Sequence, residues 1–229
     1  MINCGMKRGI KNPNTPELWD KLLFQKNKKL LGSPIYQDKL RKILSFLKSK
    51  NGKFLDIGFG AGNLEEFIIK NNLALDIYGI DISPRAVSTA KSRLEGNYYV
   101  SSVEKLPFKN SIFNIVVMAD VMEHIEKEKS VHVLAEVRRV MKKGGWLVIS
   151  VPLNEGLARL VTMEENENRH MREFTSEMLR NELRESGFVA DKMNYLYAFK
   201  KYYRIKTFVA SLIPGFREPN LLITYARKK

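Results

Sequence analysis

Short runs of apolar residues alternate with longer amphipathic segments along most of the chain. The apolar runs predict strands at 53–58, 75–81, 97–102, 112–120 and 145–152, and later strands within 188–199 and 219–229. Apolar residues at helical spacing predict helices over 63–72, 130–145 and 175–188. Strands that alternate with helices are typical of βαβ units around a parallel sheet. The pattern therefore predicts an α/β fold.

Several positions carry the residues that favour the start of a helix. Ser83 precedes Pro84, and serine is a good N-cap while proline suits the first helical turn. Thr175 stands where the helix over 175–188 should begin. Residues 16–50, ahead of the first strand, are also expected to be mostly helical.

The composition is that of an ordinary globular protein, with 44% hydrophobic and 28% charged residues among 229. This length favours one domain with attachments. The lone cysteine, Cys4, cannot form an internal disulfide, and no segment is apolar enough for a signal sequence or a membrane span. These features favour a cytoplasmic location.

The net charge of +14 is concentrated near the N-terminus. Residues 1–53 carry 13 Lys and Arg against 3 Asp and Glu, whereas residues 54–150 carry 12 of each sign. Such a basic segment attracts anionic partners such as RNA or an anionic membrane surface. It is equally compatible with a solvated lysine-rich surface.

The most informative segment is FLDIGFGAGNL, which contains D-x-G-x-G-x-G from Asp56 to Gly62 between a predicted strand and a predicted helix. Glycines allow positive φ angles and close approach of a ligand to the backbone, and the start of the helix presents free N–H groups. Asp81 ends the next strand, where a carboxylate can bind ribose hydroxyls. The segment therefore predicts a nucleoside-binding site.

The glycine spacing excludes two common nucleotide sites. A dinucleotide fingerprint needs G-x-G-x-x-G, but position 63, where the third glycine should follow Gly58 and Gly60, holds Asn63. A phosphate-binding loop should end in Gly-Lys-Ser/Thr, which the sequence lacks here. Asp56 would repel a pyrophosphate, and it suits a ligand with a cationic amino group, such as the methionine moiety of S-adenosylmethionine.

These residues also carry a family resemblance. LDIGFGAG resembles motif I of class I methyltransferases, and YGIDIS resembles the strand-two motif that follows it. Three later segments resemble motifs of the methyltransferase type 11 group: VEKLPFKNSIFNIVVMADVMEHI, MKKGGWLVISVP and HMREFTSEMLRNELRESGF. That group includes enzymes similar to the ubiquinone and menaquinone C-methyltransferases. The resemblance covers roughly residues 53–190. It implies a Rossmann-like, mostly parallel seven-stranded sheet with helices on both faces and an antiparallel last strand.

The resemblance also implies a binding site for S-adenosylmethionine and its product S-adenosylhomocysteine. Asp56 is expected to hold the methionine amino group, the backbone of 58–60 to line the amino-acid moiety, and Asp81 to bind the ribose. Ser102 stands where the family often has an acid that accepts from the adenine amine, so this contact departs from the pattern. The expected cofactor residues are Asp56, Gly58, Phe59, Gly60, Asp81, Ile82, Ser102, Val103 and Ala119. No metal is expected.

Methyl transfer from a sulfonium is an in-line displacement, so the main task of the protein is to align the acceptor. Two histidines are candidate catalytic bases: His124, just after the fourth strand, and His170, in the segment after the fifth. Packing at a helix start is the alternative role for His124. A surface position in a charged loop is the alternative for His170.

Two parts of the chain are expected to face the substrate: the N-terminal segment 1–52 and an amphipathic insertion at about 195–218 within the main domain, 53–229. One face of the insertion would carry Tyr202, Ile205, Phe208, Val209 and Leu212, opposite Lys200, Lys201, Arg204 and Thr207. Such a helix caps a sheet, contacts a membrane surface or lipid tail, or stacks on RNA.

The sequence thus favours a methyltransferase acting on a small-molecule or lipid-like acceptor through O-, C- or N-methylation. Two alternatives stay open. One is an RNA methyltransferase, which the basic N-terminal segment motivates. The other is a methyltransferase-like binding protein without catalysis. The acceptor atom and the oligomeric state are not predicted.

Overall fold

A computed structural model of the chain describes residues 13–157, 169–199, 201–213 and 215–229. The strands are β1 (Gly52–Ile57), β2 (Leu75–Asp81), β3 (Asn97–Val100), β4 (Phe113–Ala119), β5 (Met141–Pro152), β6 (Phe188–Leu196) and β7 (Leu221–Lys228). The helices are α1 (Pro16–Leu31), α2 (Pro34–Leu47), α3 (Asn63–Lys70), α4 (Pro84–Arg93), α5 (Ser130–Val140), α7 (Ser176–Glu185) and α8 (Tyr203–Leu212), with short 3-10 helices η1 (Met122–His124) and η2 (Lys127–Lys129). Cys4 and Lys200 lie outside the described residues.

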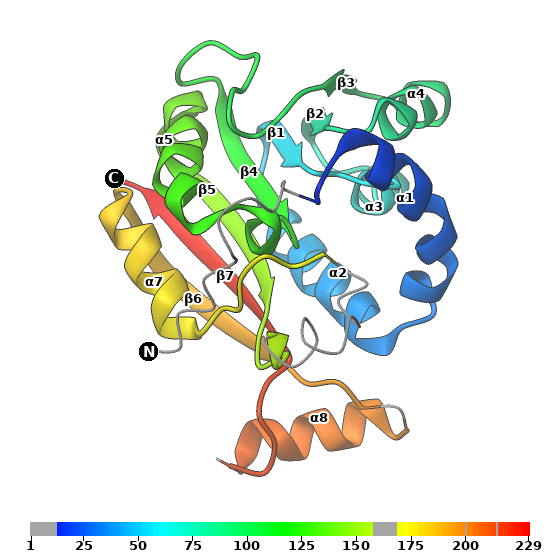
Figure 1. The fold of residues 1–229 in the computed structure, drawn as a ribbon, viewed down its shortest axis with the longest axis vertical. Coiled ribbons are helices and arrows are strands. Elements are labelled where there is room, and N and C mark those ends of the chain that lie inside the picture. The colour runs from blue at the N-terminus through cyan, green and yellow to red at the C-terminus, as the bar shows by residue number, and fades with distance from the viewer. Residues whose placement is uncertain (1–12, 158–168, 200, 214) are drawn as a thin grey trace.

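The seven strands form one sheet in the order β3-β2-β1-β4-β5-β7-β6 (Figure 1). β1 to β5 run parallel, and β7 is antiparallel to both of its neighbours, β5 and β6. The order reverses between β1 and β4, and ligands of such sheets bind at the carboxyl ends of the strands beside this reversal. The predicted Rossmann-like sheet with an antiparallel last strand is confirmed.

Helices cover both faces of the sheet, as predicted. On one face, α5 and α7 pack through a core that includes Val133, Val137 and Leu179. On the other face, α2, α3 and α4 bury residues such as Ile43 and Ile68. β4 contributes alternate side chains to the two cores, which explains why its sequence is apolar almost throughout.

The predicted helix starts are confirmed by their caps. The Ser83 hydroxyl accepts a hydrogen bond from the Ala86 N–H at 2.9 Å, and the Thr175 hydroxyl accepts one from the Met178 N–H at 3.1 Å. One boundary was wrong, because α5 ends at Val140 instead of running on to 145. The residues that follow are already part of β5, whose first residue pairs with the first residue of β4.

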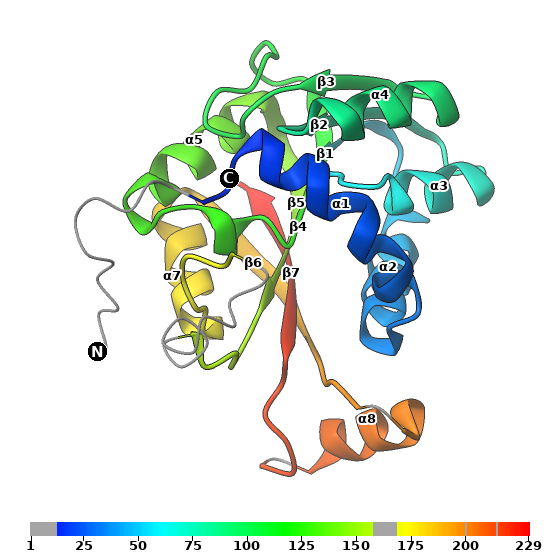
Figure 2. The same ribbon diagram turned by 45° about the vertical axis from the view of Figure 1, so that its right-hand side comes forward.

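The amphipathic insertion forms α8, which extends away from the body of the protein (Figure 2). β6 runs parallel to β5, because both are antiparallel to β7. α8 follows the end of β6 and therefore lies on the same edge of the sheet as the carboxyl ends of β4 and β5. Of the three interpretations of this helix, capping of the sheet is wrong, since Ile205, Phe208 and Leu212 are more than 60% exposed.

Within the described residues, no helix combines the length and the apolar character that a membrane crossing would need.

Candidate functional site

The glycine loop after β1 makes a tight turn that other residues would disrupt. Gly58, Gly60 and Gly62 have φ angles of 72°, 61° and 75°, a region that L side chains rarely adopt. A Cβ at Gly58 would lie 2.7 Å from Cγ2 of Val121, and one at Gly62 would lie 2.5 Å from Cδ1 of Leu94. The positive φ angles therefore favour glycine at these positions, and at Gly58 the nearby Val121 side chain also leaves little space for a Cβ.

Asp81, at the end of β2, fixes the position of this loop. Its carboxylate accepts hydrogen bonds from the Gly60 N–H and the Ser83 N–H, each at 2.9 Å. Burial raises the pKa of Asp81, although the two backbone hydrogen bonds oppose the shift. Contact between the backbone of 58–60 and a ligand stays a prediction. The Gly60 N–H already donates to Asp81. Each carboxylate oxygen retains a second lone pair that can accept from a ligand hydroxyl.

Asp56, at the end of β1, shares a buried environment with an acid that the sequence analysis missed, Glu65 of α3. The two side chains are 3% and 0% exposed, and their carboxyl groups lie close enough to interact directly. Burial and the neighbouring Glu65 raise the pKa of Asp56, and burial raises the pKa of Glu65 to about 7. One Asp56 oxygen and both Glu65 oxygens are buried without a donor group from the described residues. Such a site favours a cationic group that would satisfy these oxygens.

Glu65 carried a signal in the sequence. It lies three residues before Ile68, on the same face of α3 that packs into the core. An acid on the buried face of an amphipathic helix is uncommon, because burying an unpaired carboxylate is costly.

The N-terminal helices pack against the two helices that follow β1 and β2. The Asp20 carboxylate of α1 accepts hydrogen bonds from the Ser83 hydroxyl and from the Arg85 N–H. Asn63, at the start of α3, donates to the Asn27 side chain at 2.7 Å and to the Tyr36 hydroxyl at 2.9 Å. These contacts place α1 and α2 beside the predicted cofactor site, but their contact with a substrate stays a prediction.

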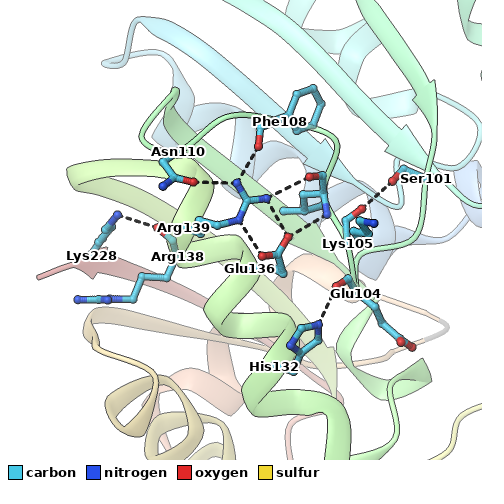
Figure 3. Close-up of polar contacts among 11 residues, drawn as sticks. Ser101, Glu104, Lys105, Phe108, Asn110, His132, Glu136, Arg138, Arg139 and Lys228 are labelled. Atoms are coloured by element: carbon cyan, nitrogen blue, oxygen red, sulfur yellow. Dashed lines mark hydrogen bonds and ion pairs between the residues drawn. The ribbon is translucent and has the colours of Figure 1, made fainter.

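The loop after β3, which carries Ser102 and Val103, is held against α5 by one arginine (Figure 3). The Arg139 guanidinium donates to the carbonyls of Leu106 and Phe108 at 3.0 and 2.7 Å and pairs with Glu136. The Glu136 carboxylate also accepts from the Leu106 N–H at 3.0 Å. This network fixes the path of the loop relative to α5.

The remaining predicted cofactor residues differ in how they are placed. Phe59 is 7% exposed and packs edge-on against Tyr98, so its side chain belongs to the core. Val103 is also buried in the core. Ser102 is exposed, and its hydroxyl accepts from the Glu104 N–H at 3.2 Å. Ile82 and Ala119 are half-buried. Contact of these residues with a cofactor stays a prediction.

A second group of charged residues lies at the end of β4. Asp120 has a positive φ of 58°, forms an ion pair with Lys39 of α2, and accepts from the Ser150 hydroxyl at 2.6 Å. Burial alone would lower the pKa of Lys39, but Asp120 outweighs it and the pKa is raised. Lys39 is 3% exposed and lies one helical turn before Ile43, so its burial is another feature that the apolar face of α2 could have revealed.

The structure brings the two predicted histidines together. The His124 and His170 rings lie edge to face with centroids 4.9 Å apart, and Trp19 of α1 packs against His124 from another side at 4.9 Å. Burial, together with the neighbouring His170, lowers the pKa of His124 to about 4, so this imidazole is neutral at pH 7. His170 is 8% exposed, so the alternative of a surface position is wrong. Catalysis by either histidine stays a prediction.

This chain is similar in sequence to known methyltransferases. A family profile described as a methyltransferase domain matches residues 33–192. The demethylmenaquinone methyltransferase of Thermotoga maritima is 30% identical over 127 residues, which cover 49% of this chain and 55% of that protein. The chain thus spans about half the length of this relative.

Solved structures share the fold. An S-adenosylmethionine-dependent methyltransferase from Archaeoglobus fulgidus aligns with a TM-score of 0.67 and 20% identity, over 91% of this chain and 99% of that one. The N-methyltransferase NodS of Bradyrhizobium japonicum, solved with S-adenosylhomocysteine, aligns with a TM-score of 0.68 and 16% identity, over 93% and 96% of the two chains.

Proposed function

The chain belongs to the methyltransferase-domain family, and on this premise we propose that it is an S-adenosylmethionine-dependent methyltransferase acting on a small-molecule or lipid-like acceptor. The observation that carries the proposal is the group of acids around the glycine loop. Asp81 is fixed by the loop backbone, and Asp56 and Glu65 hold buried oxygens that a cationic amino group would satisfy.

Each part of this site has a defined role in the proposal. When bound, S-adenosylmethionine supplies an activated methyl group together with its leaving group. Asp56 and Glu65 bind the amino group, and Asp81 accepts from the ribose hydroxyls. The contacts of Asp20 tie α1 to the start of α4, and in this position we expect α1 to limit access of water to the glycine loop. The acceptor is aligned at the end of β4, near Asp120.

The exposed surface of α8 supports a lipid-like acceptor at an anionic membrane surface. Its exposed apolar side chains and those next to it are Tyr202, Ile205, Phe208, Leu212, Ile213 and Phe216, all at least 51% exposed. Lys201, Arg204 and Lys206 are exposed on the same segment. Apolar side chains flanked by cations are typical of helices that lie in a membrane interface. Aliphatic residues such as Ile205 and Leu212 add little to stacking on RNA bases, so the surface favours lipid over RNA.

A hollow at the base of α8 is also lined by apolar and cationic side chains. It has a volume of about 690 Å³ and lies where the α8 segment meets the start of α2. Ile35 and Phe199 line it together with Lys201, Lys206 and Arg217. A pocket with apolar walls and cationic rims suits an anionic lipid headgroup and the first part of its chain.

The acceptor class can be tested directly. The purified protein is incubated with methyl-labelled S-adenosylmethionine and either a total lipid extract or bulk RNA. We expect label in the lipid fraction. Label in RNA alone would overturn the proposed acceptor, and cofactor binding with no transfer to any acceptor in a broad screen would favour the non-catalytic alternative.

The membrane contact has its own test with matched variants. Phe208→Glu and Leu212→Glu place charge on the exposed face of α8, and we expect each to reduce co-sedimentation with vesicles containing phosphatidylglycerol. Val131→Glu is the control, because Val131 is 57% exposed on α5, outside the α8 segment. Equal loss in all three variants, or binding of none of the proteins to vesicles, would contradict the contact.

A further inference from the structure

Three side chains with metal-binding chemistry meet beside the end of β4. Glu123 and His124 belong to η1, and His170 comes from the segment that follows residue 168. The Met171 N–H donates to the Glu123 carbonyl at 2.8 Å, which joins these two parts of the chain. One ligand atom from each residue lies within 4.8 Å of the other two.

This spacing is close to what one ion requires. Nitrogen and oxygen ligands bind first-row divalent metals at about 2.0–2.2 Å, so two ligand atoms on one tetrahedral ion are roughly 3.4 Å apart. Small rotations of the side chains would bring the three atoms to that separation. Two imidazoles and one carboxylate form a donor set that suits divalent transition metals better than Mg²⁺ or Ca²⁺.

Each imidazole is oriented by an oxygen at its Nδ1. His170 Nδ1 lies 2.7 Å from the Glu155 carboxylate, and His124 Nδ1 lies 3.4 Å from the Arg169 carbonyl. A histidine that binds a metal through one ring nitrogen usually donates the other N–H to a carboxylate or a backbone carbonyl. The same contacts favour the tautomer that leaves the lone pair on Nε2.

The carboxyl group of Glu123 lacks a partner. Glu123 is fully buried, and neither of its carboxylate oxygens has a hydrogen-bond partner among the described residues. Asp120 and Lys39 neutralise one another nearby. A divalent ion would give these Glu123 oxygens a partner. Buried polar oxygens that are left without any partner are unfavourable.

We propose that Glu123, His124 and His170 bind a divalent transition-metal ion, with Glu155 and the Arg169 carbonyl orienting the two imidazoles. This site differs from the sequence-based expectation that no metal is present. It lies near the end of β4, where the acceptor is expected. Resting on the proposed function, the site favours an acceptor with a hydroxyl group, because a bound metal stabilises the ionised form of an oxygen ligand.

The test measures metal binding without any methyl transfer. Tag-free protein is stripped with a chelator, dialysed separately against Zn²⁺, Mn²⁺ or Co²⁺ and then against metal-free buffer, and its metal content is determined by mass spectrometry. We expect one ion per chain for at least one metal. Visible absorption of the Co²⁺ form would report the coordination geometry of the bound ion.

Variants separate this site from adventitious binding. Calorimetric titration of His124→Ala, His170→Ala and Glu123→Gln with the retained metal should show affinity lowered more than about 100-fold. Glu155→Gln should lower it about 10–100-fold, the range typical of residues that orient a metal ligand through a hydrogen bond. His132→Ala is the control, since His132 is exposed on α5 and contacts the Glu104 carbonyl instead. Circular dichroism verifies that each variant is folded.

Two results would overturn the proposal: folded wild-type protein that retains no ion, or binding that is as tight in the His124 and His170 variants as in the wild type. Titration with S-adenosylhomocysteine in the presence of chelator is run in parallel. Absence of metal binding with intact cofactor binding would contradict only the metal site, whereas failure of cofactor binding in metal-loaded protein would contradict the proposed function.

Discussion

The two halves of the carboxyl edge of the sheet are built by different means. Around β1 and β2, the site is made largely of backbone: glycines with positive φ form the turn, and the Gly60 and Ser83 N–H groups hold Asp81. Beyond β4, it is made of buried charged side chains contributed by distant segments, such as Lys39 and Glu123. The turn of the first half is set largely by local sequence. The second depends on electrostatic balance among residues that only the folded chain brings together.

The largest expected effect is the loss of ligand affinity when the backbone-built half is disrupted. Asp81→Ala removes the acceptor of two backbone hydrogen bonds as well as the proposed contact with the ribose. Hydrogen bonds to charged groups are worth about 1.5–3 kcal/mol each, so we expect affinity for S-adenosylhomocysteine to fall about 100-fold or more in protein that remains folded. Isothermal titration calorimetry measures this loss. Unchanged affinity would remove Asp81 from the site.

The fold, and the glycine loop with its two strand-end acids, could be predicted because their signals are contiguous. D-x-G-x-G-x-G and Asp81 lie within 26 consecutive residues, and each strand shows its own apolar run. The second half could not be assembled in this way, because Lys39, Glu123 and His170 are far apart in the chain and only the fold shows that they meet. The exposure of α8 was also out of reach, since an amphipathic pattern looks the same whether its apolar face meets a sheet or solvent.

The second prediction tests the charge-built half. Lys39→Met leaves Asp120 without its cation, and we expect a loss of about 2–3 kcal/mol in the free energy of unfolding. This is below the roughly 3–5 kcal/mol typical of a fully buried pair, because the Asp120 side chain is 36% exposed. Urea denaturation measures the change. Asp120→Asn preserves the positive φ, which asparagine tolerates, so the double variant should be more stable than Lys39→Met alone. Additive losses would show that the two residues do not interact.

The third prediction concerns pH in the backbone-built half. The pKa of Glu65 is raised to about 7, so the Asp56–Glu65 pair holds a proton in the free protein at pH 6. A cationic amino group prefers the ionised pair. We therefore expect affinity for S-adenosylhomocysteine to rise about 5–10-fold from about pH 6 to about pH 7.5. Glu65→Gln should flatten this dependence, and a slope unchanged in the variant would exclude the pair as its origin.

The same pair should make the stability of the ligand-free protein fall with rising pH, whereas ligand affinity rises. A carboxyl whose pKa is higher in the folded than in the unfolded state contributes stability below its unfolded pKa, and this contribution is lost as pH rises through the folded pKa. The ligand-free protein should thus lose stability from about pH 4.5 to about pH 7 through Glu65. Comparing urea midpoints of the wild type and Glu65→Gln across this range isolates the contribution.

The smallest expected effect is that of Ser102→Ala. The Ser102 hydroxyl is exposed and already accepts from the Glu104 N–H, and Arg139 holds the loop independently of it. We expect affinity for S-adenosylhomocysteine to change less than about threefold, since an exposed neutral hydrogen bond contributes little. A loss comparable to that of Asp81→Ala would instead make Ser102 a principal contact of the adenine.

The glycine loop and its acids form the proposed site for S-adenosylmethionine. Calorimetric titration of the purified protein with S-adenosylmethionine and S-adenosylhomocysteine, with NADH as the control, tests this site most directly. We predict that both sulfur ligands bind with one site per chain and that NADH does not bind. Folded protein that binds neither sulfur ligand, or that binds NADH in their place, would contradict the assignment.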